Sequence, residues 1–311
     1  MNHDSRRTSG TGCAPAHHGE ILQGIFCDAS GPRRTLVTLR CPAYESRATF
    51  YPCAGRAEIT VPPGMWKVHN AAVAAMTTFA RKHSPVIGGS LCIASTVPCG
   101  IGIGSSTADV TAIVRAIADF HGIAPSAEEI ARVAVQAELA SDPLIIDDRV
   151  VLFAHRDGVV LETLGRQLPP MIVVGCEADP CSDGVDTVTL TPAAYSLTEI
   201  ETFGHLLAEL RTAIARADVA RLGSVATASA TVKQRFLAKP AFDFLLDACQ
   251  HYGGCGVQVA HSGTVAGIVF DPLQPRLARC MDRIADTGLR LTGVIDTIGS
   301  PVPMPQRGSP Y

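Results

Sequence analysis

Three glycines and two serines stand close together in the segment at residues 98–109, which reads PCGIGIGSSTAD. Glycine lacks a Cβ, so its backbone N–H groups can approach a ligand closely and its φ can be positive. Apolar residues then recur at helical spacing, which predicts a helix that begins at the serines. Unpaired N–H groups and the positive end of a helix dipole attract anions, phosphate above all. The segment therefore predicts a phosphate-binding loop, with a flexible strand-to-helix turn as the alternative reading.

This loop differs from two familiar phosphate loops, because no Gly-Lys-Ser/Thr follows it and its glycines are too evenly spaced for a dinucleotide fingerprint. It resembles the PxxxGLGSSAA loop of the GHMP small-molecule kinases, with Ile103 in place of the leucine. In that family the loop wraps the phosphates of ATP. The resemblance implies that ATP is bound by Pro98, Gly100, Gly102, Gly104, Ser105, Ser106 and Thr107.

Two further segments resemble motifs of the same family and occur in the expected order. Residues 14–24 read APAHHGEILQG, and residues 253–264 read GGCGVQVAHSGT. Both are similar to the motifs of the L-threonine kinases of corrinoid side-chain synthesis. The resemblance implies an ATP- and Mg²⁺-dependent kinase that phosphorylates the hydroxyl of a small amino acid, with L-threonine as the first choice.

A carboxylate and a hydroxyl are the candidate magnesium ligands, because Mg²⁺ prefers hard oxygen donors. Glu138 lies at the edge of the apolar stripe of a helix predicted to begin near Ala127, after a capping-box pair formed by Ser126 and Glu129. A carboxylate that faces inward is costly unless it is paired or binds a metal. The family places its Mg²⁺-binding glutamate on this helix, and Ser106 matches a serine whose hydroxyl also reaches the metal. A half-exposed glutamate and a helix-capping serine are the structural alternatives.

The group that accepts the proton of the substrate hydroxyl stays open between Asp142 and His17. Some family members use an aspartate after the magnesium glutamate, although their spacing is longer. Mevalonate-type kinases place a lysine in the first motif, and His17 stands at that position here. A helix-ending aspartate before a proline is an equally good reading of Asp142.

Four further side chains are expected to contact the substrate. Glu20 and Gln23 could read an ammonium and a carboxylate, and Arg40 could pair the carboxylate bidentately. His261 falls in the third motif, beside the predicted phosphate loop. Each of these residues could equally be structural.

Composition limits the remaining partners. A net charge of −3 argues against a broad nucleic-acid or anionic-membrane surface, and no uninterrupted apolar stretch is long enough to span a membrane. The eleven cysteines include no Cys-x-x-Cys pair, so they are expected to be reduced in a cytoplasmic protein. A homodimer is compatible with these observations.

The pattern of elements predicts an α+β protein. Strands are expected over 34–41, 46–51 and 57–61, helices over 70–82, 106–120 and 127–140, and a hairpin over 150–164. Pro169 and Pro170 mark the predicted domain boundary. After it, the order strand–helix–helix–strand–strand–helix–strand fits a ferredoxin-like layout with one extra helix.

The GHMP resemblance implies a matching two-domain fold. We expect an N-terminal ATP-binding domain of ribosomal-protein-type βαβ form over 1–168, a ferredoxin-like domain over 169–299, and a disordered tail over 300–311. Three other functions stay open. They are a GHMP kinase for another alcohol such as homoserine or a sugar, an inactive binding module of this fold, and a diphosphate-dependent decarboxylase.

Overall fold

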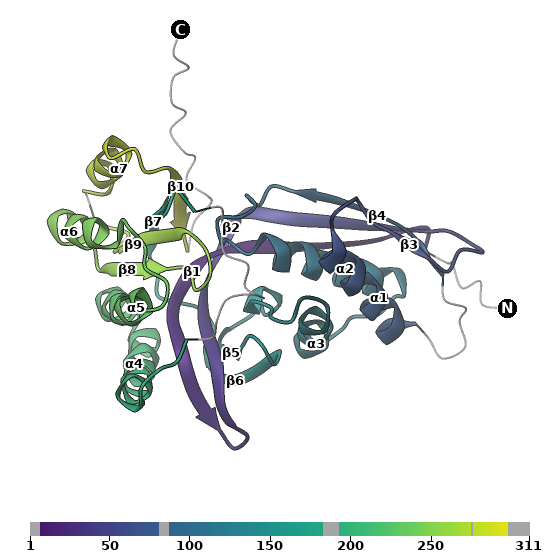
Figure 1. The fold of residues 1–311 in the computed structure, drawn as a ribbon, viewed down its shortest axis with the longest axis horizontal. Coiled ribbons are helices and arrows are strands. Elements are labelled where there is room, and N and C mark those ends of the chain that lie inside the picture. The colour runs from purple at the N-terminus through teal and green to yellow at the C-terminus, as the bar shows by residue number, and fades with distance from the viewer. Residues whose placement is uncertain (1–6, 81–86, 183–192, 275, 298–311) are drawn as a thin grey trace, which may run out of the picture.

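The computed structural model describes residues 7–80, 87–182, 193–274 and 276–297. Two long antiparallel strands, β1 (Gly10–Asp28) and β2 (Gly31–Pro52), form the curved backbone of the molecule (Figure 1). The described strands share one sheet in the order β10-β7-β9-β8-β1-β2-β4-β3, and the β5–β6 hairpin pairs with β2. The predicted α+β class is confirmed.

Irregular pairing in β1 aims side chains of the first motif in different directions. The register with β2 shifts between His17 and Glu20, where Gly19 has a φ of +67°. Such a bulge bends a strand and redirects its side chains. His18 turns to Thr292, which lies 2.8 Å from its Nε2 atom, while His17 faces the opposite side. The bulge therefore separates a structural histidine from one that reaches the glycine loop.

Three helices cover one face of the β1–β2–β4 region (Figure 1). They are α1 (Trp66–Phe79), α2 (Ser105–Phe120) and α3 (Ala127–Glu138). The α3 helix begins at the predicted capping box, in which Ser126 and Glu129 satisfy each other's backbone N–H groups. Strands β3 (Ile59–Thr60) and β4 (Gly89–Ser95) complete this edge, and β5 (Val150–Ala154) and β6 (Val159–Gly165) form the predicted hairpin.

The second half of the chain builds the other end of the sheet. Strands β7 (Ile172–Glu177), β8 (Gly256–Val259), β9 (Val265–Phe270) and β10 (Leu291–Asp296) pair antiparallel in the order β10-β7-β9-β8. Helices α4 (Leu197–Arg216), α5 (Val219–Gln234) and α6 (Phe242–Tyr252) precede β8, and α7 (Leu277–Asp286) precedes β10. The order of elements is the predicted one except that three helices, not two, lie between β7 and β8; α6 is the helix that was not predicted.

Two of the sequence expectations need correction. Strands 34–41 and 46–51 are one strand, β2, because Pro42 falls in a three-residue bulge between the partners of Pro15 and Ala16. A bulge tolerates a proline that a regular ladder would exclude. The predicted helix 70–82 begins earlier, at Trp66. The tail over 300–311 lies outside the described residues, and the boundary at 168/169 stays a prediction.

The larger apolar core joins the two halves. It contains residues of α2 and α3 together with Phe203 and Leu210 of α4 and Leu222 of α5. A second core lies between the α6 and α7 helices and strands β7–β9. No helix among the described residues is long and apolar enough to cross a membrane.

The loop before α2 and the turn after β8 touch through two glycine backbones. A Cβ on Gly102 would lie 2.1 Å from the Cα of Gly263, and Gly102 has a φ of +82°. The N–H of Thr264 also donates to the carbonyl of Ile101 at 2.9 Å. No side chain fits between the two segments, so the glycine loop and the third motif, far apart in sequence, meet at a fixed separation.

We predict that Gly102→Ala destabilises the fold more than Gly55→Ala. Gly55 has a similar φ of +79° but open space around it, so that control isolates the backbone strain, roughly 1–2 kcal/mol. The Gly102 variant adds overpacking, for a total of about 2–4 kcal/mol in the free energy of unfolding. Urea denaturation of both variants measures the difference. Equal losses would show that the contact does not constrain the fold.

Candidate active site

The glycine loop presents unpaired backbone donors at the start of α2. Gly100, Gly102 and Gly104 all have positive φ, between +77° and +84°. Within the described chain, none of the N–H groups of residues 100–106 donates a hydrogen bond to another protein group. Because these donors precede the positive end of a sixteen-residue helix, the loop has the electrostatics of an anion site.

A cavity of about 180 Å³ opens onto this loop. Its walls combine loop atoms with side chains from five other segments, and they include His17, Lys67, Glu138, Asp142, His155, His261 and Ser262. A larger cavity of about 370 Å³ lies elsewhere and is lined by Arg40 and Asp147. We place the site in the smaller cavity, because only that one brings unpaired N–H groups together with buried carboxylates.

Glu138 is buried at the end of α3 and points at the start of α2. Its exposed fraction is 3 %, and its two oxygens accept hydrogen bonds from Ser106 Oγ at 2.8 Å and Thr107 Oγ1 at 3.0 Å. Burial, reinforced by the negative charge of Asp142, raises the pKa of Glu138 to about 7, although both hydroxyls oppose the shift. The carboxylate is therefore costly to ionise unless a cation joins it.

The donor set around Glu138 fits Mg²⁺. A carboxylate and a hydroxyl within hydrogen-bond distance supply hard oxygen ligands, and the cavity leaves room for the waters that Mg²⁺ retains. The raised pKa is the expected signature of a buried carboxylate that awaits a positive charge. Glu138 and Ser106 are therefore the residues that would hold the metal.

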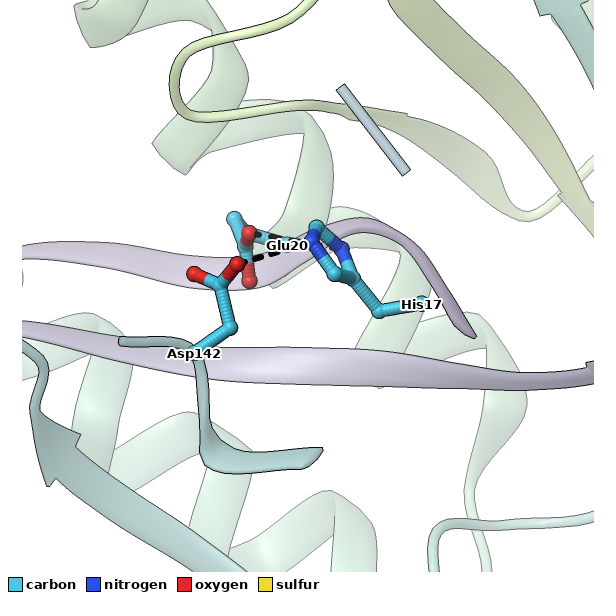
Figure 2. A group of neighbouring side chains, drawn as sticks. All are labelled: His17, Glu20 and Asp142. Carbon is cyan, nitrogen blue, oxygen red and sulfur yellow. Dashed lines mark hydrogen bonds and ion pairs between the residues drawn. The ribbon is translucent and has the colours of Figure 1, made fainter. Parts of the chain in front are cut away.

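His17 lies between two carboxylates, as Figure 2 shows. Its Nε2 atom is 3.1 Å from Asp142 Oδ2, and its Nδ1 atom is 3.9 Å from Glu20 Oε1. Glu20 also accepts a 2.5 Å hydrogen bond from Thr38 Oγ1. One nitrogen of His17 and one carboxylate oxygen each from Glu20 and Asp142 lie within 4.8 Å of one another. Only the contact between His17 and Asp142 is short enough for a shared proton, so Glu20 acts on His17 through its charge.

The charges of His17, Asp142 and Glu20 depend on one another. Burial lowers the pKa of His17, but Asp142 and Glu20 outweigh it and raise the pKa above its usual value. Burial would raise the pKa of Asp142, yet the adjacent His17 holds it well below its usual range. Burial raises the pKa of Glu20 to about 7. The pair therefore favours an ionised Asp142 beside a protonated His17.

Most of the predicted site residues meet in this cavity. The three loop glycines, Ser105, Ser106, Thr107, Glu138, Asp142, His17 and His261 all line it. Pro98 is half-buried at the entry to the loop and does not line the cavity. The roles assigned to these residues stay predictions. The fold does bring motifs from three parts of the chain to one cavity.

The remaining substrate candidates lie elsewhere. Gln23 lines an adjoining recess, which shares His155 and His261 with the cavity. The side chain of Glu20 is completely buried behind His17, so no surface of it faces the cavity. Arg40 lines the larger cavity and donates to the carbonyl of Asp147 at 2.8 Å. Its guanidinium therefore faces away from the glycine loop.

Sequence reasoning missed His155 and Lys233 and left Lys67 unassigned. His155 stacks edge-on against His261, with 4.9 Å between ring centroids, but it follows a strand that no motif marks. Lys233 lines the adjoining recess from α5, a helix with no motif of its own. Lys67 lines the loop cavity, and its neighbour Trp66 opens α1. Only Lys67 carried a signal, since it falls in a segment that often borders the nucleotide entrance in the resembled family.

Comparison with known proteins shows what this part of the chain is similar to. Residues 70–148 match the GHMP kinases N terminal domain, which includes the glycine loop, α2 and α3. The chain is 26 % identical over 197 residues to an L-threonine kinase from Salmonella typhimurium and 30 % identical over 192 residues to one from Citrobacter freundii. These matches cover 63 % and 58 % of this chain but only 65 % and 61 % of the relatives, slightly under two thirds.

Solved structures show the same fold over almost the whole chain. A homoserine kinase from Cytophaga hutchinsonii has a TM-score of 0.69 at 15 % identity, with 96 % of this chain and 98 % of that chain covered. A mevalonate kinase from methicillin-resistant Staphylococcus aureus has a TM-score of 0.59 at 15 % identity, with 94 % and 100 % covered. The resemblance and fold class predicted from the sequence are therefore confirmed.

We predict that Glu138→Gln becomes more stabilising, relative to the native chain, as pH rises. The folded-state pKa near 7 lies above the ordinary value of 4.5, so the native fold binds the extra proton and loses stability between about pH 4.5 and 7. Glutamine cannot ionise and escapes this loss.

Urea unfolding at pH 5 and pH 8, without metal or nucleotide, measures the effect. Glu201→Gln, the same substitution at an exposed position of α4, is the control. A stability difference between native chain and Glu138→Gln that does not change with pH would contradict the buried, proton-binding carboxylate.

Proposed function

We propose that this chain, whose residues 70–148 match a GHMP kinase N-terminal domain, transfers the γ-phosphoryl group of ATP to the hydroxyl of a small amino acid, with L-threonine as the preferred acceptor. The observation that carries the proposal is the convergence of the glycine loop, the Ser106–Glu138 pair and the His17–Asp142 pair on one cavity. Phosphoryl transfer needs such a combination of phosphate donors, metal ligands and a proton acceptor.

The loop would hold the phosphates of ATP through the N–H groups of residues 100–106, with Lys67 as a nearby cation. Mg²⁺, held by Glu138 and Ser106, would offset the negative charge that builds on the transferred group. The protein's part is positioning. The contact between Gly102 and Gly263 fixes the loop against the turn that carries His261.

Asp142 is the proposed proton acceptor. The acceptor's hydroxyl oxygen forms the new bond to the γ-phosphorus, the bond from that phosphorus to the ADP oxygen breaks, and the hydroxyl proton passes to Asp142 Oδ. His17 keeps Asp142 ionised until that moment, which the low pKa of the carboxyl reflects. The histidine thus takes the electrostatic part that a first-motif lysine plays in mevalonate-type kinases, while the aspartate does the proton transfer.

L-threonine is preferred because both curated relatives are L-threonine kinases and because the first and third motifs resemble that branch. The runner-up is another alcohol, since the structural neighbours include homoserine and mevalonate kinases. The presence of Glu138 with both hydroxyl partners favours a kinase over an inactive binding module.

Incubation with ATP, Mg²⁺ and a panel of acceptors tests the proposal, with ADP release and phosphorylated product as readouts. We expect kcat/KM for L-threonine to exceed that for L-serine by roughly 10- to 200-fold, the worth of one methyl group in a pocket. It should exceed that for 2-propanol and galactose by up to about 10⁴-fold, because charged partners in the site would stay unpaired. Faster turnover of a sugar or an uncharged alcohol would refute the amino-acid acceptor.

Asp142→Asn is the control that assigns the turnover to this site. Its kcat should fall by about 10²- to 10⁴-fold, the usual contribution of a positioned base, with little change in the KM for ATP. Near-normal kcat in this variant would show that a different group receives the proton.

A further inference from the structure

A second recess adjoins the loop cavity and shares two of its walls. His155 and His261 line both spaces, and the recess continues to Arg34 of β2 and Lys233 of α5. His261 lies close enough to both Asp142 and Lys233 for their charges to influence its pKa, which burial and His155 lower. One small molecule could therefore contact Asp142 at one end and Lys233 at the other.

Lys233 is a buried cation with no partner among the described residues. Its exposed fraction is 6 %, and no hydrogen bond or ion pair to its ammonium is found in that part of the chain. Burial lowers its pKa to about 8, with help from the charges of Lys239 and Arg34. A buried lysine is almost always paired, because desolvation of the ammonium is expensive. An anionic ligand in the recess would supply the counter-charge.

The rest of the recess offers donors and no acid. Among the described residues that line it, there is no aspartate or glutamate, while Arg34 and Arg156 add positive charge. Thr35 Oγ1 and His155 Nδ1 are buried polar atoms without a hydrogen-bond partner in the described chain. Glu20 acts on Lys233 electrostatically, but its side chain is completely buried outside the recess. Unpaired donors beside an unpaired cation fit an anionic, planar, hydrogen-bonding group.

We propose that this recess binds the carboxylate of the acceptor and that Lys233 is the specificity-determining residue that reads it. The inference rests on the proposed function and replaces Arg40, whose guanidinium lines a different cavity. With the carboxylate at Lys233, His155 and His261 lie along the body of the acceptor, and its hydroxyl extends toward Asp142. Tyr195 and Phe236, whose rings pack 4.7 Å apart, close the apolar side of the recess.

A comparison of L-threonine with L-threoninamide, its neutral isostere, tests the role of Lys233. The native chain should prefer L-threonine by roughly 10- to 100-fold in kcat/KM, the worth of a hydrogen bond to a charged group. Lys233→Met removes the charge and keeps the apolar length. Its KM for L-threonine should rise by a similar factor, while its KM for L-threoninamide and for ATP and its kcat should stay near the native values.

Arg216→Gln is the control. It removes one positive charge from an exposed position in the last turn of α4 that does not line the recess. This control should retain the full preference for L-threonine. An equal loss on both acceptors in Lys233→Met, or no preference in the native chain, would overturn the carboxylate assignment.

Direct binding separates this inference from the proposed function. If the native chain phosphorylates no hydroxy amino acid, the proposed function fails, and calorimetric titration of L-threonine without nucleotide decides the recess on its own. Binding that is lost in Lys233→Met and kept in Arg216→Gln would support the carboxylate site. No binding by the native chain, or equal binding by both variants, would refute it.

Discussion

The contact between the Gly102 and Gly263 backbones is the constraint on which the site depends. It leaves no room for a Cβ on either residue, and the hydrogen bond from Thr264 to Ile101 supports it. The glycine loop belongs to the β1–β2–β4 half of the sheet, and His261 belongs to the β8–β9 turn. Because close-packed backbone atoms leave no room to slide, the glycine loop and His261 keep one position relative to each other.

Electrostatics in the cavity follow from burial. Burial raises the pKa values of Glu138 and Glu20 to about 7. The pKa of Asp142 is low instead, because the charge and hydrogen bond of His17 outweigh the effect of burial. Neighbouring acids with different pKa values are the pattern by which an active site divides its roles. Here Glu138, whose pKa is raised, is the proposed magnesium ligand, and Asp142, whose pKa is lowered, is the proposed proton acceptor.

Local signals predicted a large part of this arrangement. The glycine spacing, the helix start at Ser105 and the capping box at Ser126 each depend on neighbouring residues, so the sequence alone was enough for the loop, α2 and α3. The family resemblance added the order of the motifs. The continuous β2 strand was not predicted, because the bulge that accommodates Pro42 is a property of its pairing with β1.

The acceptor side needed the fold. Nothing in the sequence around Lys233 indicates that it is buried. Its burial follows from the packing of α5 against β1 and β8. Glu20 belongs to the first motif and Arg40 to the neighbouring strand β2. Alternate residues of a strand face opposite sides, and the bulge at Gly19 changes that alternation in β1. Which polar residue reaches the cavity is therefore a question of register that spacing does not answer.

We propose that ATP phosphates and an amino-acid hydroxyl meet between the glycine loop and Asp142. A crystal structure with a non-hydrolysable ATP analogue, Mg²⁺ and L-threonine measures this directly. We expect the phosphates on the N–H groups of residues 100–106, the metal on Glu138, and the threonine hydroxyl within about 2.6–3.2 Å of an Asp142 oxygen. A nucleotide bound in the cavity at Arg40, or a threonine whose hydroxyl points away from Asp142, would contradict it.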